Sequence, residues 1–444
     1  MHPRLRRAVL VAAAAALAPA AAPAQTPSLA LVGGRILDGF GGPPVEDGVV
    51  LIAGERIVAV GPSSEVEVPE GVEVVDTNGM TVLPGLCDMH VHLQLLGHGD
   101  YARWDELYGE RDEEVMAIAA RQLLEAGVTC ARDLGGPLDA LVATRRAIVE
   151  GRIPGPRLFI SGPFLQRAPY EPWQADYRWG VDGPDDARRK TRRLLDAGVD
   201  VVKLIDQDQL TPDEVSAIVE TAHAAGIPVV AHAHRMDEIR VGLRHGVDAF
   251  EHTGLGTAPG YAEDVLAALG ERNTGIWWTP TISPLYVMQH TGEVFPERLD
   301  DPSWREHMPA AMAAEIRASL EHIPRLPYYA LFPSRIPLLP RKFEQIRGTG
   351  ARLLVGTDSG IPSMFHTDST WREMVKWVEL GVSPMEVIQA ATLWPGRFFR
   401  RDDLGNLAPG SLADVIAVRG DPLTDMGVLR DVAVVVRGGE VVRR

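Results

Sequence analysis

Two kinds of hydrophobic pattern divide the chain into two similar ends and a different middle. Near the N-terminus, β-branched runs at 29–32, 49–52 and 56–60 are separated by glycine and proline, which is typical of a small antiparallel sheet. The runs at 413–418 and 432–436 near the C-terminus have the same character. Because neither end alone offers a sizeable core, we expect both to pair into one small domain.

The middle of the chain repeats another unit: an amphipathic helix, a glycine, a short apolar strand and then polar residues. Continuous apolar strands are typical of a parallel sheet that is buried on both faces. Eight such strands are expected, at residues 83–90, 128–133, 158–161, 199–203, 227–232, 247–252, 276–279 and 353–358. Eight βα units predict an α/β fold, a (β/α)₈ TIM-type barrel with a small β-sandwich domain formed by the N- and C-terminal segments.

The first residues have the layout of a secretory signal. Arg4, Arg6 and Arg7 precede the apolar stretch 8–18 and a small-residue cleavage site. This stretch is too short to span a bilayer permanently, so we expect an exported protein, periplasmic or secreted, without a membrane anchor after cleavage. Four segments are therefore expected: a signal peptide at 1–24, sandwich strands at 25–82, the barrel at 83–403 and further sandwich strands at 404–444.

Composition and charge exclude several classes of protein. With 45% hydrophobic and 23% charged residues the chain is globular rather than disordered. Its formal net charge of −16 argues against a nucleic-acid partner, which clustered lysine and arginine would bind. Only two cysteines, Cys87 and Cys130, exclude a disulfide scaffold. Because parallel neighbouring strands rarely offer disulfide geometry, we expect two inert buried thiols.

Polar residues at the ends of the expected strands carry the candidate chemistry. In a parallel barrel the C-terminal ends of all strands face one side, where active sites lie. Alternation along a strand places His90 and His92 on the same face. Each residue alone has an ordinary structural explanation, but their shared position in the repeat favours one site, and imidazole with carboxylate suits zinc or a similar ion. The residues at this opening are His90, His92, Asp133, Ser161, Lys203, His232, His252 and Asp358.

Lys203 is the most informative of these residues. It stands within the apolar run 201–205, where an unpaired ammonium group is costly to desolvate and burial favours the neutral amine. Beside two metal ions such an amine can take up carbon dioxide and bridge them as a carbamate. The alternatives are an ion pair with Asp133 or Asp358, or a side chain that extends to the barrel rim.

These motifs resemble the amidohydrolase superfamily over almost all of the mature chain. Residues 81–92, TVLPGLCDMHVH, resemble the strand-one signature, and residues 404–414 resemble the return of the chain into the flanking sandwich. The set His-x-His, Lys, His, His, Asp is similar to the binuclear class with a carboxylated lysine. The nearest branch is that of the prolidase-like and imidazolonepropionase-related enzymes.

The resemblance implies two divalent metal ions, for which zinc is the first expectation, and N6-carboxylysine at Lys203. One ion has His90, His92 and Asp358 as ligands, and the other has His232 and His252. Carboxylated Lys203 and a hydroxide bridge the two ions. Asp358 is also the expected catalytic residue, because a carboxylate at a metal can accept the hydroxide's proton and return it to the departing amine. His234 does not match a ligand of the family and is left out.

We therefore predict an exported metal-dependent hydrolase that cleaves amide bonds in small peptides, including the Xaa-Pro type, or in N-acyl amino acids. A lactonase or carboxylesterase on the same binuclear site is the main alternative. A mononuclear deaminase is disfavoured by Lys203 and by Arg235, where deaminases of the superfamily carry a glutamate. A non-catalytic binding protein is disfavoured because all six ligand positions are filled.

Substrate-binding residues are less evident in the sequence. The candidates are Tyr170, Tyr286 and His366, and a substrate carboxylate has further possible partners in Arg167, Tyr177, Arg178 and Arg235. The stretch 281–348 is too long for an ordinary barrel connection. It forms either a lid over the site or a contact between copies in a homo-oligomer.

Overall fold

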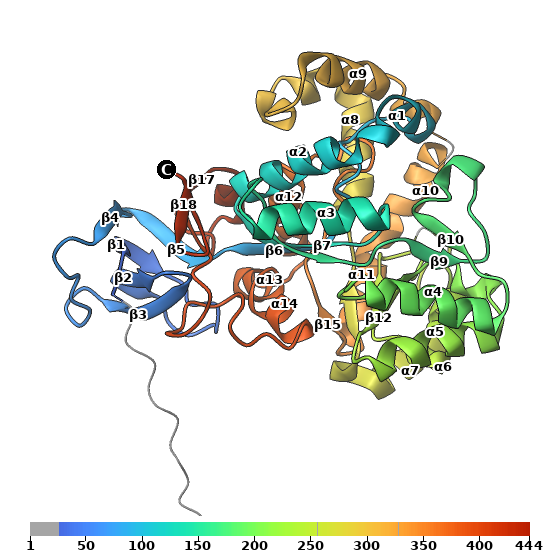
Figure 1. The fold of residues 1–444 in the computed structure, drawn as a ribbon, viewed down its shortest axis with the longest axis horizontal. Coiled ribbons are helices and arrows are strands. Elements are labelled where there is room, and N and C mark those ends of the chain that lie inside the picture. Colours follow the sequence, from blue (N-terminus) through green and yellow to red (C-terminus); the bar gives the residue numbers. More distant parts are fainter. Residues whose placement is uncertain (1–25, 255, 327) are drawn as a thin grey trace, which may run out of the picture.

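The computed structural model describes residues 26–254, 256–326 and 328–444, which form a barrel domain and a smaller sheet domain (Figure 1). The expected signal peptide, residues 1–24, lies outside these described residues. Within the same ranges, no helix combines the length and the apolar character that crossing a bilayer requires.

Eight parallel strands build the barrel, as the hydrophobic pattern predicts. They are β6 (Leu86–Val91), β7 (Val128–Asp133), β8 (Arg157–Ile160), β11 (Val202–Leu204), β12 (Val229–His232), β13 (Ala249–Glu251), β14 (Trp277–Thr279) and β15 (Arg352–Leu353). Two seams join the sheet β6-β7-β8 to the sheet that contains β11 to β15. Asp200 N donates to Ile160 O at one seam, and Met89 N donates to Val355 O at the other. Short strands β9 (Phe164–Gln166) and β10 (Arg178–Gly180) extend the second sheet.

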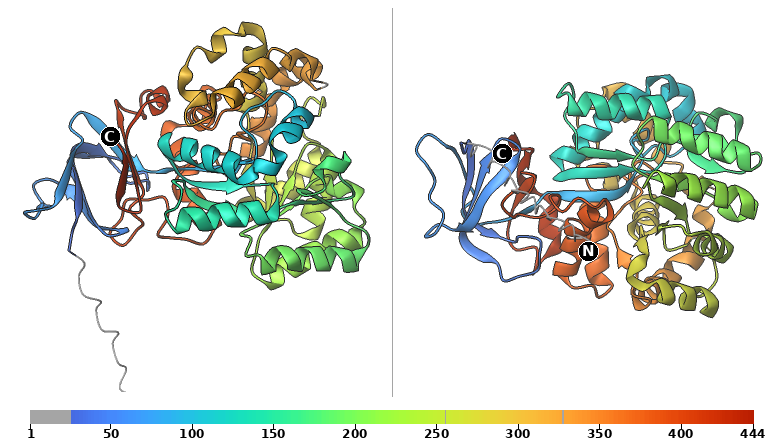
Figure 2. Two further views of the ribbon diagram at one scale, coloured as in Figure 1. Left: turned by 45° about the horizontal axis from the view of Figure 1, so that its top comes forward. Right: turned by 60° about the horizontal axis from the view of Figure 1, so that its bottom comes forward.

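Helices surround the strands on the outside of the barrel (Figures 1 and 2). Helix α5 illustrates the repeat: Thr211 and Glu214 form a capping box at its start, Pro212 occupies its first turn, and Gly226 at φ +74° follows its end. The helices are α1 (Tyr101–Tyr108), α2 (Asp112–Glu125), α3 (Leu138–Val149), α4 (Pro184–Asp196), α5 (Pro212–Ala224), α6 (Met236–His245), α7 (Glu263–Arg272), α8 (Ser283–Val294), α9 (Ala310–Leu320), α10 (Phe332–Arg335), α11 (Leu339–Gly348), α12 (Ser369–Glu379), α13 (Pro384–Ala390) and α14 (Leu393–Phe398).

The two ends of the chain share the second domain, as predicted. Its strands are β1 (Leu29–Ile36), β2 (Val45–Ala53), β3 (Arg56–Pro62), β4 (Glu73–Asp76), β5 (Met80–Pro84), β16 (Val415–Arg419), β17 (Val432–Arg437) and β18 (Glu440–Arg443). Strand β5 joins the two ends because it pairs with both β1 and β16. Figure 2 shows these N- and C-terminal strands side by side at one end of the molecule. Leu31, Ile52, Val415 and Val434 belong to a hydrophobic core of this domain's own.

The first barrel strand begins later than the hydrophobic pattern indicates. Residues up to Pro84 pair with β16 in the sheet domain, and the barrel strand starts at Leu86. One apolar run therefore serves both domains in succession, and hydrophobicity alone does not mark the change of partner.

Cys87 and Cys130 form a disulfide, so the expectation of two free thiols is wrong. The two residues stand directly opposite each other in the pairing of β6 with β7, with Cα atoms 4.5 Å apart. This separation lies within the range that a disulfide spans. The local register of these two parallel strands, which the sequence does not specify, brings the sulfur atoms together.

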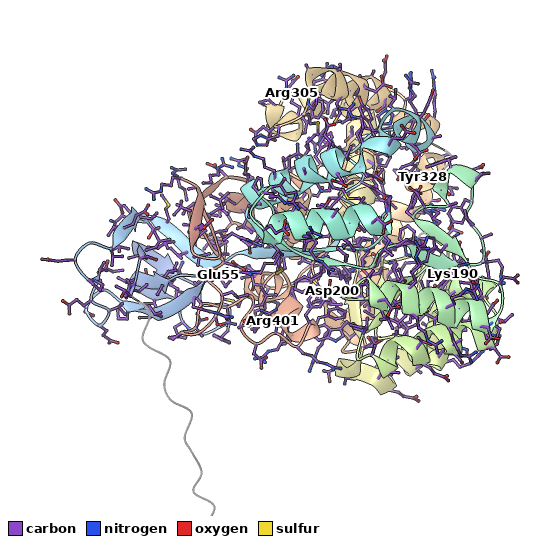
Figure 3. All side chains as sticks on the ribbon, viewed as in Figure 1. Glu55, Lys190, Asp200, Arg305, Tyr328 and Arg401 are labelled. Atoms are coloured by element: carbon purple, nitrogen blue, oxygen red, sulfur yellow. A yellow bond between two sulfur atoms is a disulfide. The ribbon has the colours of Figure 1, made fainter. Side chains whose placement is uncertain are left out.

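The long segment between β14 and β15 folds into α8 to α11 and several short 3₁₀ turns. Figure 1 shows α8 and α9 above the barrel strands. Tyr328, which is labelled in Figure 3, and Phe332 from this segment line the cavity at the barrel mouth. At least this part of the segment covers the site, as a lid would.

Candidate active site

The barrel brings the six predicted metal ligands to one end of its strands. They come from β6 and the residue after it (His90, His92), β11 (Lys203), the end of β12 (His232), the residue after β13 (His252) and the loop after β15 (Asp358). Of the other strand-end residues, Asp133 accepts hydrogen bonds from Leu93 N and Gly135 N, so its carboxylate holds a neighbouring loop.

Asp358 lies at the centre of one group of ligands. Its Oδ1 is 3.0 Å from His92 Nε2 and 3.6 Å from His90 Nε2, and its Oδ2 is 3.9 Å from His252 Nδ1. Three ligand atoms, one each from His90, His252 and Asp358, lie within 4.8 Å of one another. An arrangement of this size fits a divalent ion.

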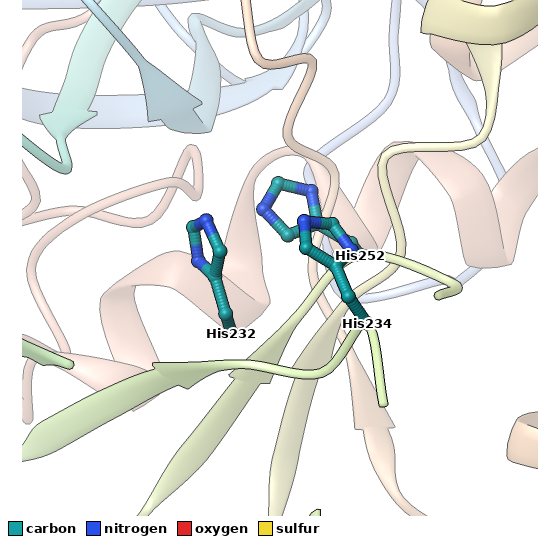
Figure 4. Close-up of side chains that lie close together, drawn as sticks. All are labelled: His232, His234 and His252. Carbon is teal, nitrogen blue, oxygen red and sulfur yellow. The ribbon is translucent and has the colours of Figure 1, made fainter. Parts of the chain in front are cut away.

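His234 belongs to a second group that the sequence interpretation missed. Ligand atoms of His232, His234 and His252 also lie within 4.8 Å of one another. Figure 4 shows the three rings gathered beyond the strand ends, and the rings of His234 and His252 stack with centroids 4.4 Å apart. The signal was present in the sequence, because His232-Ala-His234 repeats the His90-x-His92 spacing that places two side chains on one face.

Lys203 lies fully buried behind this cluster. Its Nζ has no hydrogen-bond partner within the described part of the chain. Burial is the main cause that lowers the pKa of Lys203 from 10.5 to about 7. Neither alternative from the sequence applies, since the side chain does not reach the rim and makes no ion pair with a described carboxylate. Burial therefore shifts this amine, which faces the ligand groups, toward its neutral form.

Several other buried nitrogen atoms of the cluster also have no hydrogen-bond partner among the described residues. They are His90 Nε2, His232 Nδ1, His234 Nδ1 and His252 Nε2. Leaving such groups unsatisfied is costly, and a bound cation would offset that cost. Burial, followed by the charge of Lys203, holds the pKa of His90 and His232 well below the usual value. Neutral imidazole is the form that binds metal, so the donor set fits divalent ions.

Two of the predicted ligands have strained backbones. His252 has φ +73° and Asp358 has φ +57°, in the left-handed region that few residues other than glycine adopt. Such strain concentrates at functional sites, where the surrounding structure holds it in place. The backbone near Asp358 is also tightly packed against β6, because a Cβ on Gly356 would lie only 2.8 Å from His90 N.

Buried partners orient the ligands from behind. Glu251 Oε2 accepts a hydrogen bond from His90 Nδ1 at 2.9 Å, and Arg132 Nη2 donates to Glu251 Oε1 at 2.7 Å. Thr281 Oγ1 lies 2.8 Å from His252 Nδ1. A hydrogen bond to one ring nitrogen determines which nitrogen remains free to bind a metal. The bond to Glu251 therefore leaves His90 Nε2 directed toward the cluster.

A cavity of about 420 Å³ opens over the ligands. Its wall includes Tyr170, whose hydroxyl donates to Asp206 Oδ2 at 2.6 Å. The other two predicted substrate residues are not brought to this wall. Tyr286 packs beneath Lys376 Nζ, and His366 is buried between Ser359 Oγ and the carbonyl oxygen of Leu95.

Two arginines line the same cavity. Arg178 was one of several sequence candidates, whereas Arg335 lies in the long segment before β15 and was missed. Nε and Nη1 of Arg335 are buried and have no partner among the described residues. No strand-end position marks Arg335 in the sequence, because it reaches the cavity only through the folding of the long segment.

Comparisons with known proteins agree with this geometry. The family model described as "Amidohydrolase family" matches residues 81–442. Ochratoxinase from Aspergillus niger is 26% identical over 435 residues, covering 88% of this chain and 81% of that protein. Imidazolonepropionase from Caulobacter vibrioides is 28% identical over 234 residues, covering 44% of this chain and 56% of that protein.

Solved structures resemble the whole described fold. The crystal structure of a Xaa-Pro dipeptidase with methionine bound in its active site has a TM-score of 0.73 and 25% sequence identity, covering 94% of this chain and all of that chain. These matches confirm the resemblance drawn from the strand-one and strand-end motifs. The chain therefore belongs to the amidohydrolase family of enzymes.

Proposed function

We propose that this protein is an exported metal-dependent hydrolase that cleaves the amide bond of dipeptides, including the Xaa-Pro type, or of N-acyl amino acids. The observation that carries the proposal is Lys203: a fully buried amine with no hydrogen-bond partner among the described residues, next to four histidines and an aspartate. A buried amine without a hydrogen bond is costly, and modification of the amine or participation in a metal site would offset that cost.

The six ligands would hold two divalent ions, with zinc as the first expectation. His90, His92 and Asp358 would hold one ion, and His232 and His252 would hold the other. Bound ions would supply hydroxide near neutral pH and polarise the substrate carbonyl. His234, which lies in the second group, is available as a further donor or as a contact for the substrate.

Lys203, as a carbamate, would be a ligand shared by the two groups of metal-binding residues. The lone pair of the neutral Nζ would form a bond to the carbon of carbon dioxide, one C=O π pair would move onto an oxygen atom, and Nζ would give up one proton to water. The product is N6-carboxylysine, with one negative charge shared by two oxygen atoms. A pKa lowered to about 7 supports this step, because the neutral amine is the reacting form.

Asp358 would move the proton during hydrolysis. Its carboxylate lies 3.0 Å from His92 Nε2 and lines the cavity where a substrate carbonyl would bind. From this position Asp358 can accept the proton of the attacking water at a carboxylate oxygen and deliver it to the departing amine. This carboxylate therefore combines positioning with general acid and base catalysis.

The cavity favours a substrate with a carboxylate. Arg335 offers two buried nitrogen atoms that have no partner in the part of the chain that the structure describes, and Arg178 lines the same wall. Arginine binds carboxylates through paired hydrogen bonds. Similarity to a Xaa-Pro dipeptidase supports the same substrate class.

Export is supported by two features of the chain. The basic and apolar start of the sequence has the layout of a signal peptide. The Cys87–Cys130 disulfide suits an oxidising compartment.

A hydrolysis screen with metal-reconstituted protein tests the proposal. We expect turnover of Xaa-Pro dipeptides or N-acyl amino acids and loss of turnover after chelation. Matched amide and ester substrates with one acyl group separate the peptidase from a lactonase or carboxylesterase. A metal-loaded protein that hydrolyses none of the amides would contradict the proposal.

A further inference from the structure

A side pocket lies next to the metal-ligand cavity. It has a volume of about 160 Å³, and a cavity of roughly 150 Å³ can bind a molecule the size of benzene. The residues that line both cavities are His92, Tyr101, Phe164, Arg178 and Ile361. A substrate whose amide lies at the ligand cluster can therefore extend one of its groups into this side pocket.

Three carboxylates from separate segments line the side pocket. Asp105 belongs to α1, Asp112 begins α2, and Asp176 lies in the loop before β10. None of the three makes an ion pair with a basic residue in the described part of the chain. Burial, together with the charge of Asp176 and then of Asp105, raises the pKa of Asp112 to about 7. Like charges at these positions repel one another, and the basic side chains that line the same pocket, His92 and Arg178, form no ion pair with them.

The buried amide of Gln94 independently indicates a ligand. Gln94 is 8% exposed and lines the side pocket, and its Oε1 has no partner among the described residues. An N–H donor of a bound molecule would satisfy this oxygen. Trp173 and Tyr177 provide aromatic walls beside it, and aromatic faces attract cations.

Arg178 does not neutralise the three carboxylates of the side pocket. Its Nη1 donates to Gln166 Oε1 at 3.0 Å, and its guanidinium lies 4.4 Å from the ring centroid of Tyr170 and 5.0 Å from that of Phe164. It makes no ion pair with any of the three described carboxylates.

The spacing of the carboxylates suits an organic cation better than a metal ion. The groups of described residues whose ligand atoms lie within 4.8 Å of one another do not include Asp105, Asp112 and Asp176 together. A metal ion needs its ligands at about 2–2.6 Å, whereas an ammonium or guanidinium group on an alkyl chain can address carboxylates that are further apart.

We propose that the side pocket binds a cationic group of the substrate, either the ammonium or guanidinium of a basic side chain or a free α-ammonium group. This inference rests on the proposed amide hydrolysis and names the substrate class: amides that carry a positive charge near the scissile bond. Arg335 of the main cavity and the acids of the side pocket then bind opposite charges of one substrate.

Calorimetry with butylguanidinium tests the pocket without turnover. We expect the protein to bind butylguanidinium about tenfold or more tightly than butylurea, its neutral analogue, because hydrogen bonds to charged groups contribute more. The Asp105→Asn/Asp112→Asn variant should lose this difference. Glu113→Gln, an exposed acid on the same helix that does not line the side pocket, is the matched control and should keep it.

Substrate pairs identify the source of the cation. Comparing the hydrolysis of Lys-Ala with that of norleucine-Ala tests for a cationic side chain on the acyl side of the amide. Comparing Ala-Lys with Ala-norleucine tests for a cationic side chain on the leaving side. Comparing Ala-norleucine with its N-acetyl form tests for the α-ammonium group. In at least one pair the charged substrate should have a kcat/KM about tenfold or more higher. The Asp105→Asn/Asp112→Asn variant should reduce that ratio.

The two experiments separate failure of the pocket from failure of the proposed function. Equal binding of butylguanidinium and butylurea, or a preference that survives in the folded double variant, would overturn the inference. Hydrolysis of amides without any charge preference would overturn it as well. Charge-selective binding without hydrolysis of any amide would instead contradict the proposed function and support the cation pocket.

Discussion

Glu251 and His90 form a fully buried pair in which Oε2 of the carboxylate accepts a hydrogen bond from Nδ1 of the imidazole at 2.9 Å. Arg132 holds the other carboxylate oxygen. Glu251 thereby fixes the ring so that His90 Nε2 faces Asp358.

Replacement of Glu251 should weaken metal binding. We expect Glu251→Gln to lower metal affinity by about 10–100-fold, because an amide orients and polarises the imidazole less well than a carboxylate. Metal titration with a chromophoric chelator measures the affinity. Glu344→Gln, an exposed acid on α11, is the control. Unchanged affinity in a folded Glu251→Gln protein would exclude the orienting role.

Removal of the buried lysine should remove the proposed bridge between two metal ions. Lys203→Ala is expected to retain about one metal ion in place of about two and to lose nearly all turnover. Carbon-13 NMR after incubation with labelled bicarbonate should detect a carbamate in the parent protein and none in the variant. Lys376→Ala, on the surface beside Glu379, should behave like the parent. Near-parental metal content and turnover in Lys203→Ala would show that Lys203 does not bridge.

Asp358→Asn should affect amides more than activated esters. An amine leaving group needs a proton, which we propose that Asp358 delivers, whereas p-nitrophenolate departs without one. We expect kcat for an amide to fall by about 10²–10⁴-fold and kcat for the matched p-nitrophenyl ester to fall less, at equal metal content. Equal losses on both substrates would assign Asp358 to metal binding alone.

The disulfide between β6 and β7 should stabilise the barrel. Cys87 and Cys130 are 43 residues apart, and closing a loop of that length contributes about 4 kcal/mol in the chain-entropy model. The double variant Cys87→Ala/Cys130→Ala should therefore unfold at a lower urea concentration. The same loss is expected when the parent protein is reduced, and an unchanged midpoint under both conditions would contradict it.

Asp112 should make stability depend on pH. Its folded pKa is raised to about 7, so between about pH 4 and 7 the folded protein binds more protons than the unfolded chain, and stability falls as pH rises. Asp112→Asn should thus be more stable than the parent at pH 8, by about 1 kcal/mol after allowance for solvent screening and the lost helix-dipole contribution. The two proteins should converge near pH 4.

Glu113→Gln is the control for this pH effect, because Glu113 also lies in the first turn of α2 but faces solvent. Thermal unfolding at pH 4, 6 and 8 measures all three proteins. A parent protein that is more stable than Asp112→Asn at pH 8 would contradict the expected repulsion among the pocket acids.

The sequence by itself determined the barrel and the chemistry at its mouth. The helix–glycine–strand repeat is a local pattern, and in a parallel barrel the C-terminal ends of all strands lie at the same end of the barrel. His90, Lys203 and Asp358 could therefore be assigned to one opening although they are far apart in the chain.

The tertiary structure alone decided the features that depend on distances between unrelated segments. The disulfide follows from the register of β6 against β7, Arg335 reaches the cavity through a long irregular segment, and Asp105 meets Asp176 only where a helix and a loop converge. Hydrophobic periodicity specifies which face of an element is buried, but it carries no information about which side chains of other elements will lie opposite, because that depends on packing across the whole fold.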